Sequence, residues 1–115
     1  MWNIIFYEKE DGTKPVEEFL DTLPSKHRAK AVWEMELLGE SGVTLGKPYT
    51  SHISGKLWEL RIKFASDISR VFYFVQSGKK IVLLHGFVKK SQRTPKSETS
   101  IAETYLSDFE RREGK

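Results

Sequence analysis

The segment from Leu57 to Lys90 constrains the fold most, because it predicts three consecutive antiparallel β-strands. Residues 57–64 alternate between apolar and charged side chains, which is typical of a strand with one buried face. Residues 69–76 are rich in β-branched and aromatic side chains, and residues 80–87 contain a continuous apolar run. Both are therefore predicted as interior strands, and the chain is expected to fold around this meander.

The turns between these strands determine which side chains share a face. Ser77-Gly78 indicates a two-residue hairpin, which places Arg70 opposite His85. A two- or four-residue loop before residue 69 places Arg61 on the face of Arg70, whereas a three-residue loop separates them. With the even loop, one face is predicted to be apolar and to carry Trp58, Leu60, Ile62, Phe64, Val71, Tyr73, Val75, Val82 and Leu84. The other face is predicted to carry Arg61, Lys63, Arg70, His85, Phe72 and Phe74.

The segments before the meander predict one more strand and a helical hairpin. Residues 1–7 are aromatic and β-branched and can add a strand to the sheet. Pro15 can open a helix that ends at Pro24, and Ser25 can cap a second helix that ends near Gly39 or Gly42. Apolar residues at helical spacing in both segments predict packing against the apolar sheet face.

The remaining segments complete an α+β fold. Residues 40–56 are predicted as a long connection, which suggests a functional or mobile loop. Thr94-Pro95 is predicted to begin an amphipathic C-terminal helix that runs toward Arg112 and either packs on the sheet or binds a partner. We therefore expect an N-terminal strand and a helical hairpin on an antiparallel sheet of about four strands, with a C-terminal helix.

Length and composition narrow the class of protein. A chain of 115 residues is expected to form a single domain, residues 1–115. It contains no cysteine and only three histidines, which have no metal-ligand spacing, so we expect no metal and no cofactor. No apolar run approaches the roughly 20 residues of a membrane helix, and the N-terminus lacks a signal-peptide pattern. We expect a cytoplasmic protein that does not bind membranes.

Positive charge is concentrated in one part of the chain. Residues 51–96 contain ten Lys or Arg against two acidic residues, a net charge of +8 within a chain of net charge +3, so the remainder carries −5. Such asymmetry is typical of proteins that bind a polyanion, and nucleic acid is the commonest one in a cytoplasm. The alternative interpretation is a charged surface that is simply solvated.

Three blocks of sequence carry a family resemblance. They are LWELR at residues 57–61, SRVFY at residues 69–73 and LHGFVKKSQRTP at residues 84–95. Together with the predicted order of strands and helices, these blocks resemble the RelE/ParE toxin superfamily, and in particular its phage-derived, HigB-type branch. The resemblance covers nearly the whole chain.

The resemblance implies an activity and a set of partners. HigB-type toxins of type II toxin–antitoxin systems are mRNA interferases, which cut messenger in the ribosomal A site and so inhibit translation. A helix-turn-helix antitoxin of the HigA kind neutralises them, and operator DNA is contacted only through that complex. RNA-cleaving members use a basic site on the sheet instead of a metal. ParE-type relatives poison gyrase on the same fold, so a gyrase inhibitor or a non-catalytic nucleic-acid-binding module is the alternative.

Within that resemblance, the cationic residues can be assigned to chemical steps. The RNA 2′-hydroxyl attacks the adjacent phosphate, so the protein must move two protons and stabilise a dianionic phosphorane. Arg61 and Arg70 suit the phosphorane, although a salt bridge is the alternative. A lysine among other cations can have a lowered pKa, so candidates for the proton steps are Lys63, Lys89 and Lys90. His85 is either an acid or base near neutral pH or a histidine hydrogen-bonded within the sheet.

A second group of residues is predicted to bind RNA without taking part in the reaction. Arg93 lies just before the expected C-terminal helix, whose first N–H groups favour a phosphate. Lys56 belongs to the same basic segment. Phe72 and Phe74 can stack on a splayed base, although aromatics in central strands more often belong to the core.

Overall fold

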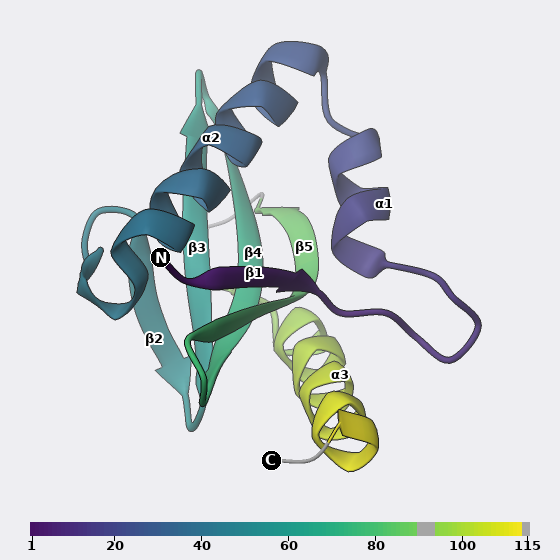
Figure 1. Cartoon of the computed structure of the whole chain (residues 1–115). Helices are drawn as coiled ribbons and strands as arrows, with labels where there is room; N and C mark the ends of the chain where they lie inside the picture. The colour runs from purple at the N-terminus through teal and green to yellow at the C-terminus, as the bar shows by residue number, and fades with distance from the viewer. Residues whose placement is uncertain (90–93, 114–115) are drawn as a thin grey trace.

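The computed structural model describes residues 1–89 and 94–113 and confirms the α+β class (Figure 1). The elements are β1 (Asn3–Phe6), α1 (Pro15–Asp21), α2 (Ser25–Ser41), the short 3-10 helix η1 (Gly42–Thr44), β2 (Thr50–Ser54), β3 (Leu57–Phe64), β4 (Asp67–Gln76), β5 (Lys80–Lys89) and α3 (Lys96–Glu113). The strands form one sheet in the order β1-β5-β4-β3-β2. Only the β1–β5 pair is parallel, so this sheet of five strands is mostly antiparallel.

Helices cover both faces of the sheet (Figure 1). Helices α1 and α2 bury one face in a core that includes Leu60, Ile62, Val71, Tyr73, Ile81 and Leu83. Helix α3 covers the other face through Ala102 and Phe109, against Leu57, Phe72, Phe74, Val82, Leu84 and Phe87. The C-terminal helix therefore packs on the sheet, which was one of its two predicted roles.

Strand β2 was predicted as part of a long connection and is the main error in the predicted elements. Residues 50–54 pair antiparallel with β3 at the edge of the sheet. Only Thr50 of this strand is buried, and its sequence, TSHIS, lacks an apolar alternation. An edge strand of this kind is held by backbone hydrogen bonds to its neighbour, so sequence pattern alone does not identify it.

The loop between β3 and β4 has two residues, which confirms the even loop. Phe64 lies opposite Asp67, so Ala65 and Ser66 form the turn and Arg61 lies directly opposite Arg70. Cross-strand partners point to the same face of a sheet. The register therefore places Arg61 and Arg70 together, as predicted.

The loop between β4 and β5 differs from the prediction by one residue. Gln76 lies opposite Lys80, so the turn contains three residues, with Lys79 at a φ of 58°. One extra residue inverts the start of β5, and Val82 and Leu84 consequently face α3 and not α1 and α2. A bulge at Phe72/Tyr73 restores the predicted faces beyond it. His85 therefore lies opposite Phe72, and Phe87 takes the place opposite Arg70 that was predicted for His85.

Trp58 was predicted to lie in the core, but its side chain remains 36% exposed. It lies near the edge of the sheet, beside β2, where its ring contacts the His52 ring at a centroid distance of 5.1 Å. Leu60 and Ile62 of the same strand are fully buried. The packing of α2 on β3 is therefore centred on these two aliphatic residues.

Polar contacts also hold α3 in place. The Tyr7 hydroxyl donates a hydrogen bond of 2.5 Å to Asp108, and Arg112 donates to Asp108 and to the Glu8 carbonyl. These contacts hold the pKa of Asp108 at about 2, through the hydrogen bonds from Arg112 and Tyr7. In the described part of the chain, no helix is long and apolar enough to span a membrane.

Glu34 is a buried carboxyl group on α2, with only 1% of its side chain exposed. The nearest cation is the Lys30 ammonium at 3.7 Å, and Oε1 has no hydrogen-bond partner among the described residues. Burial raises the pKa of Glu34 to about 7, against the opposing effect of Lys30. The folded state therefore binds a proton here that the unfolded chain releases above its ordinary pKa of 4.5.

We expect this carboxyl group to make the protein less stable as pH rises. The contribution of Glu34 is fully favourable below pH 4.5 and is lost as pH rises through about 7, a change of about 3 kcal/mol in the free energy of unfolding. Glu34→Gln should remove this dependence and be the more stable protein at pH 8, as measured by urea unfolding at pH 5 and pH 8. Glu36→Gln, on the exposed side of α2, is the control and should keep the dependence. If the free energy of unfolding changed by the same amount between pH 5 and pH 8 in wild type and in Glu34→Gln, the expectation would be contradicted.

Candidate phosphate-binding site

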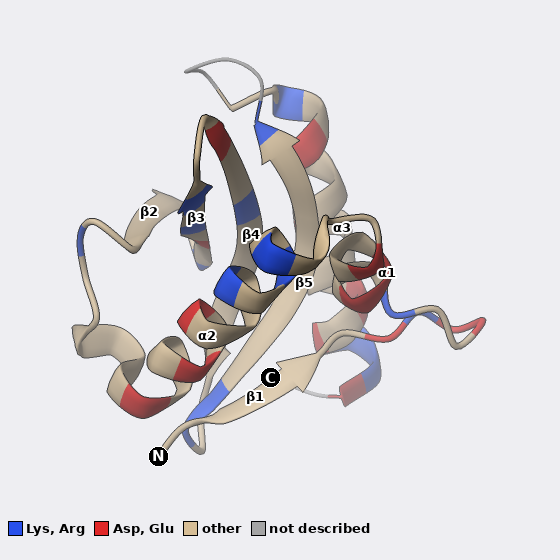
Figure 2. Ribbon diagram, turned by 90° about the horizontal axis from the view of Figure 1, so that it is seen from above, with Lys and Arg blue, Asp and Glu red and all other residues tan. Residues whose placement is uncertain are grey.

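Three cations and one carboxylate meet on the face of the sheet that α3 only partly covers. Arg61 of β3 lies directly opposite Arg70 of β4, and Glu59 lies two residues before Arg61, on the same face. Lys89 lies near the end of β5, opposite Ile68 and close enough to both arginines for their charges to shift its pKa. We call these four residues the arginine cluster. Figure 2 shows the basic segments of β3, β4 and β5 that contribute to it.

Arg70 was predicted to project from an exposed basic face, but only 6% of it is exposed. Its Nη1 donates to Oε2 of Glu59, which is itself 3% exposed and also accepts a hydrogen bond of 3.0 Å from the Ser51 hydroxyl. The salt-bridge alternative therefore describes Arg70. Removing one partner of a buried ion pair is strongly destabilising, so Arg70→Ala is expected to lower the stability of the protein as well as remove a charge.

Glu59 was not recognised as a site residue from the sequence, where it appeared only as one charged residue of an alternating strand. The available signal was its charge and position: it is the one acidic residue in β3, on the face that carries Arg61 and Lys63. A single carboxylate among cations on one strand face indicates an ion pair within the site. Its burial, however, depends on β2, and that strand was not predicted.

Lys89 lies in an environment that lowers the pKa of its ammonium group. Burial holds the pKa of Lys89 below its ordinary value, and the positive charges of Arg70 and Arg61 act in the same direction. The negative charge of Glu59 partly opposes them. A lowered pKa leaves a larger fraction of the lysine neutral near pH 7, and the neutral amine can accept a proton.

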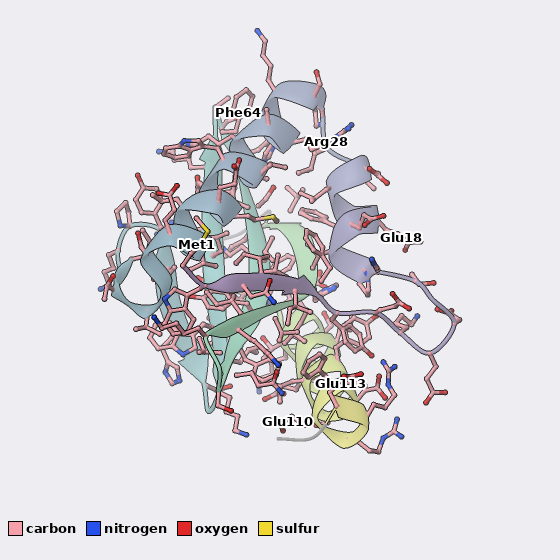
Figure 3. The ribbon with its side chains drawn as sticks, viewed as in Figure 1. Met1, Glu18, Arg28, Phe64, Glu110 and Glu113 are labelled. Carbon is pink, nitrogen blue, oxygen red and sulfur yellow. The ribbon has the colours of Figure 1, made fainter. Side chains whose placement is uncertain are left out.

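Lys63 and Lys56 lie at opposite ends of β3. Lys63 is exposed beside the β3–β4 turn, on the face of Arg61. Lys56 precedes β3 and pairs with Glu110 of α3 at 2.5 Å. Figure 3 shows Phe64 near the upper end of the sheet and Glu110 near the lower end. Lys63 is therefore two residues from Arg61 and on the same face, whereas Lys56 lies at the other end of β3 and is paired with α3.

His85 lies between the sheet and α3. Its Nε2 contacts Oε1 of Glu98 at 2.8 Å, and its ring lies 6.1 Å from the Tyr105 ring, centroid to centroid. The side chain of His85 is 16% exposed. His85 shares the face of Arg70 and Phe72. The partner of its side chain, however, is a residue of α3 and not of another strand.

Phe72 and Phe74 do not have the exposure that stacking on a base requires. Their exposed fractions are 0% and 2%, because α3 covers both rings. The Phe74 ring meets the Phe109 ring edge-on at 5.7 Å. The proposed stacking role is therefore corrected to a role in the α3 core.

Two predicted site residues, Lys90 and Arg93, lie outside the described residues. Among residues 1–89 and 94–113, no three His, Asp or Glu side chains gather closely enough to hold a metal ion. The charge of the arginine cluster comes from its four side chains. Its three cations and one carboxylate carry +2 with Lys89 protonated, which suits a phosphate group.

The fold and this cluster define a small α+β protein with a cationic cluster on one face of a mostly antiparallel sheet. Comparison with protein families identifies the chain more closely: it belongs to the family described as phage derived protein Gp49-like (DUF891), whose model matches residues 18–107. This family belongs to the HigB/RelE-like toxin group. No curated protein matches the chain. The matched region includes the whole arginine cluster.

Proposed function

We propose that this protein is the toxin of a type II toxin–antitoxin system and acts as an endoribonuclease on ribosome-bound messenger. The arginine cluster is the observation that carries the proposal, because it combines two guanidinium groups on adjacent strands with a lysine whose pKa is lowered. Membership of the HigB/RelE-like toxin group supports it. The basic segment of residues 51–96 would provide attraction to RNA over a longer range.

In the proposed reaction, the RNA supplies the nucleophile. The 2′-hydroxyl gives its proton to a neutral amine and attacks the adjacent phosphorus, the bond from phosphorus to the 5′-oxygen breaks, and that oxygen takes up a proton from water. The products are a 2′,3′-cyclic phosphate and a 5′-hydroxyl. Arg61 and Arg70 would stabilise the dianionic phosphorane, because a guanidinium remains charged and can hold two oxygens.

Lys89 is the residue we assign to a proton-transfer step. The neutral amine accepts the proton of the 2′-hydroxyl, and the resulting ammonium lies beside the arginines that hold the phosphorane. Lys63 is exposed near the end of β3, on the face of Arg61, and would bind the RNA backbone. His85 could take part in proton transfer only if the contact between its Nε2 and Glu98 were broken, because that contact occupies the nitrogen.

Two classes of partner follow from the proposed function. The substrate is messenger held on the ribosome, and a helix-turn-helix antitoxin of the HigA kind would neutralise the toxin and link it to operator DNA. The proposal is supported by family membership and by the charge of the cluster.

Induced expression of the chain is expected to arrest growth and to cleave messenger within coding regions. The 5′ ends at the cuts should carry hydroxyl groups, which can be mapped by ligation-based RNA sequencing. Co-expression of the adjoining helix-turn-helix protein, if the neighbouring gene encodes one, should restore growth. Growth arrest with intact messenger, and with DNA damage in its place, would contradict the proposal and favour a gyrase poison.

A further inference from the structure

Glu59 connects three strands of the sheet at the arginine cluster. Ser51 of β2 lies directly opposite it, whereas Arg70 of β4 lies diagonally, two residues from the Phe72 that faces Glu59. Oε2 of Glu59 accepts from both the Ser51 hydroxyl and the Arg70 guanidinium. The carboxylate thus ties the guanidinium of the central strand to the edge strand.

Arg61 and Arg70 require such a counter-charge. Two like charges directly opposite each other on neighbouring strands destabilise a sheet, and an unpaired buried charge costs several kcal/mol. Arg70 is 6% exposed and its strand neighbour across the ladder is Arg61. Because Glu59 offsets one of the two charges, both guanidinium groups can stay on the same face.

Several polar atoms of the cluster still lack a partner. Among the described residues, the buried atoms Glu59 Oε1, Arg61 Nε and Arg70 Nε make no hydrogen bond. Buried polar groups are nearly always satisfied, so the two unpaired arginine Nε–H groups indicate a place that an acceptor can complete, whereas Glu59 Oε1 is itself an acceptor. The two Nε–H groups are donors, and phosphate oxygens are acceptors that suit them.

We propose that Glu59 is a positioning residue for the reaction, which holds Arg70 in one orientation and sets the charge of the site. The inference rests on the proposed endonuclease function. With Glu59 present, the Arg70 guanidinium is fixed before RNA arrives and the cluster carries +2, which matches the −2 of the phosphorane. Without this carboxylate, Arg70 can turn to any nearby phosphate and bind the ground state of the RNA as well as its transition state.

Glu59→Gln should therefore separate binding from turnover. The amide keeps the size of the side chain and removes its charge. The variant is expected to lose some stability with its ion pair, and Arg70 loses the charged partner that competes with RNA. Turnover on ribosome-bound messenger should fall about a hundredfold, as expected for misplacement of a catalytic group by about 1 Å. Affinity for an uncleavable 2′-O-methyl RNA oligonucleotide should be unchanged or higher, with a log–log salt dependence steeper by about 0.7 for one added phosphate contact.

Glu110→Gln is the matched control, because it causes the same change in net charge. Glu110 pairs with Lys56 at the far end of β3, away from the cluster, and its side chain is 17% exposed. This variant should cleave messenger and bind RNA as the wild type does. Ser51→Ala keeps the carboxylate and removes only its hydroxyl contact, so turnover should fall less than in Glu59→Gln.

The outcomes separate this inference from the proposed function. Wild-type turnover in Glu59→Gln would overturn it. A parallel loss of turnover and RNA affinity would also overturn it, since that result describes a purely structural ion pair; a loss of thermal stability alone is expected from the broken ion pair. If Ser51→Ala lost as much turnover as Glu59→Gln, the hydroxyl and not the charge would be the essential feature. A wild-type protein that leaves ribosome-bound messenger intact would instead reject the endonuclease function itself.

Discussion

Replacement of Arg61 by alanine is expected to lower the rate of messenger cleavage by about a hundred- to a thousandfold, the usual effect of removing one preorganised charge from a developing oxyanion. Arg61 is a better test than Arg70, because Arg70→Ala would leave Glu59 buried without its partner. The Arg61 amide donates to the Tyr49 carbonyl at 2.7 Å, and alanine retains this backbone bond. The variant should therefore remain folded. Turnover on programmed ribosomes and urea unfolding measure the two effects.

Lys56→Ala provides the charge-matched control for Arg61→Ala. Lys56 lies at the other end of β3 and contacts Glu110, so its loss removes one positive charge without altering the cluster. Cleavage by this variant should fall far less than in Arg61→Ala, because Lys56 contributes only longer-range attraction to RNA. If Arg61→Ala and Lys56→Ala reduced cleavage equally, the basic segment would act only by general attraction of RNA, and the cluster would not be the catalytic site.

Replacement of Phe72 by alanine is expected to lower the free energy of unfolding by about 3–5 kcal/mol. Phe72 is fully buried where α3 covers β4, and its ring lies 5.4 Å from the Phe87 ring. Alanine would leave a cavity between the sheet and α3. Urea unfolding measures this loss, and the dependence of the unfolding free energy on urea concentration is compared between wild type and variant.

Phe72→Leu distinguishes a core residue from one that stacks on a base. Leucine fills much of the space and has no aromatic face, so a core role predicts a smaller loss of stability and nearly wild-type cleavage of messenger. A stable Phe72→Leu variant that no longer cleaves would restore the stacking interpretation. A stable Phe72→Ala variant would contradict the burial of the ring under α3.

Local sequence pattern was sufficient for most of the fold. These patterns are the alternation in residues 57–64, the apolar run in residues 80–87 and the helical spacing of residues 15–23, which depend on interactions within each segment or with any apolar surface. In residues 25–41 the pattern predicted the helix but not its buried face, since the apolar Val32 and Trp33 of α2 are exposed. The pairing of Arg61 with Arg70 could also be predicted, because a short loop and a period of two residues determine it. Family motifs in the same region support the class of protein.

The tertiary structure decided the features that depend on several segments at once. The three-residue turn at Lys79 and the bulge at Phe72 moved Val82 and Leu84 under α3, and no local pattern indicates a compensating pair of this kind. The burial of Phe72 required α3 to cover the sheet. An aromatic or aliphatic residue in a strand gives the same sequence pattern whether its side chain lies on a binding face or in the core.

The environment of the site was also decided in three dimensions. Sequence made Arg61, Arg70 and Lys89 candidates by their charge, since charge belongs to the residue itself. The partner of Arg70 depended on Glu59 and on Ser51 of β2, an edge strand without an apolar pattern. Burial, ion pairing and pKa arise from the groups that surround a residue, and those groups come from strands that only the folded chain brings together.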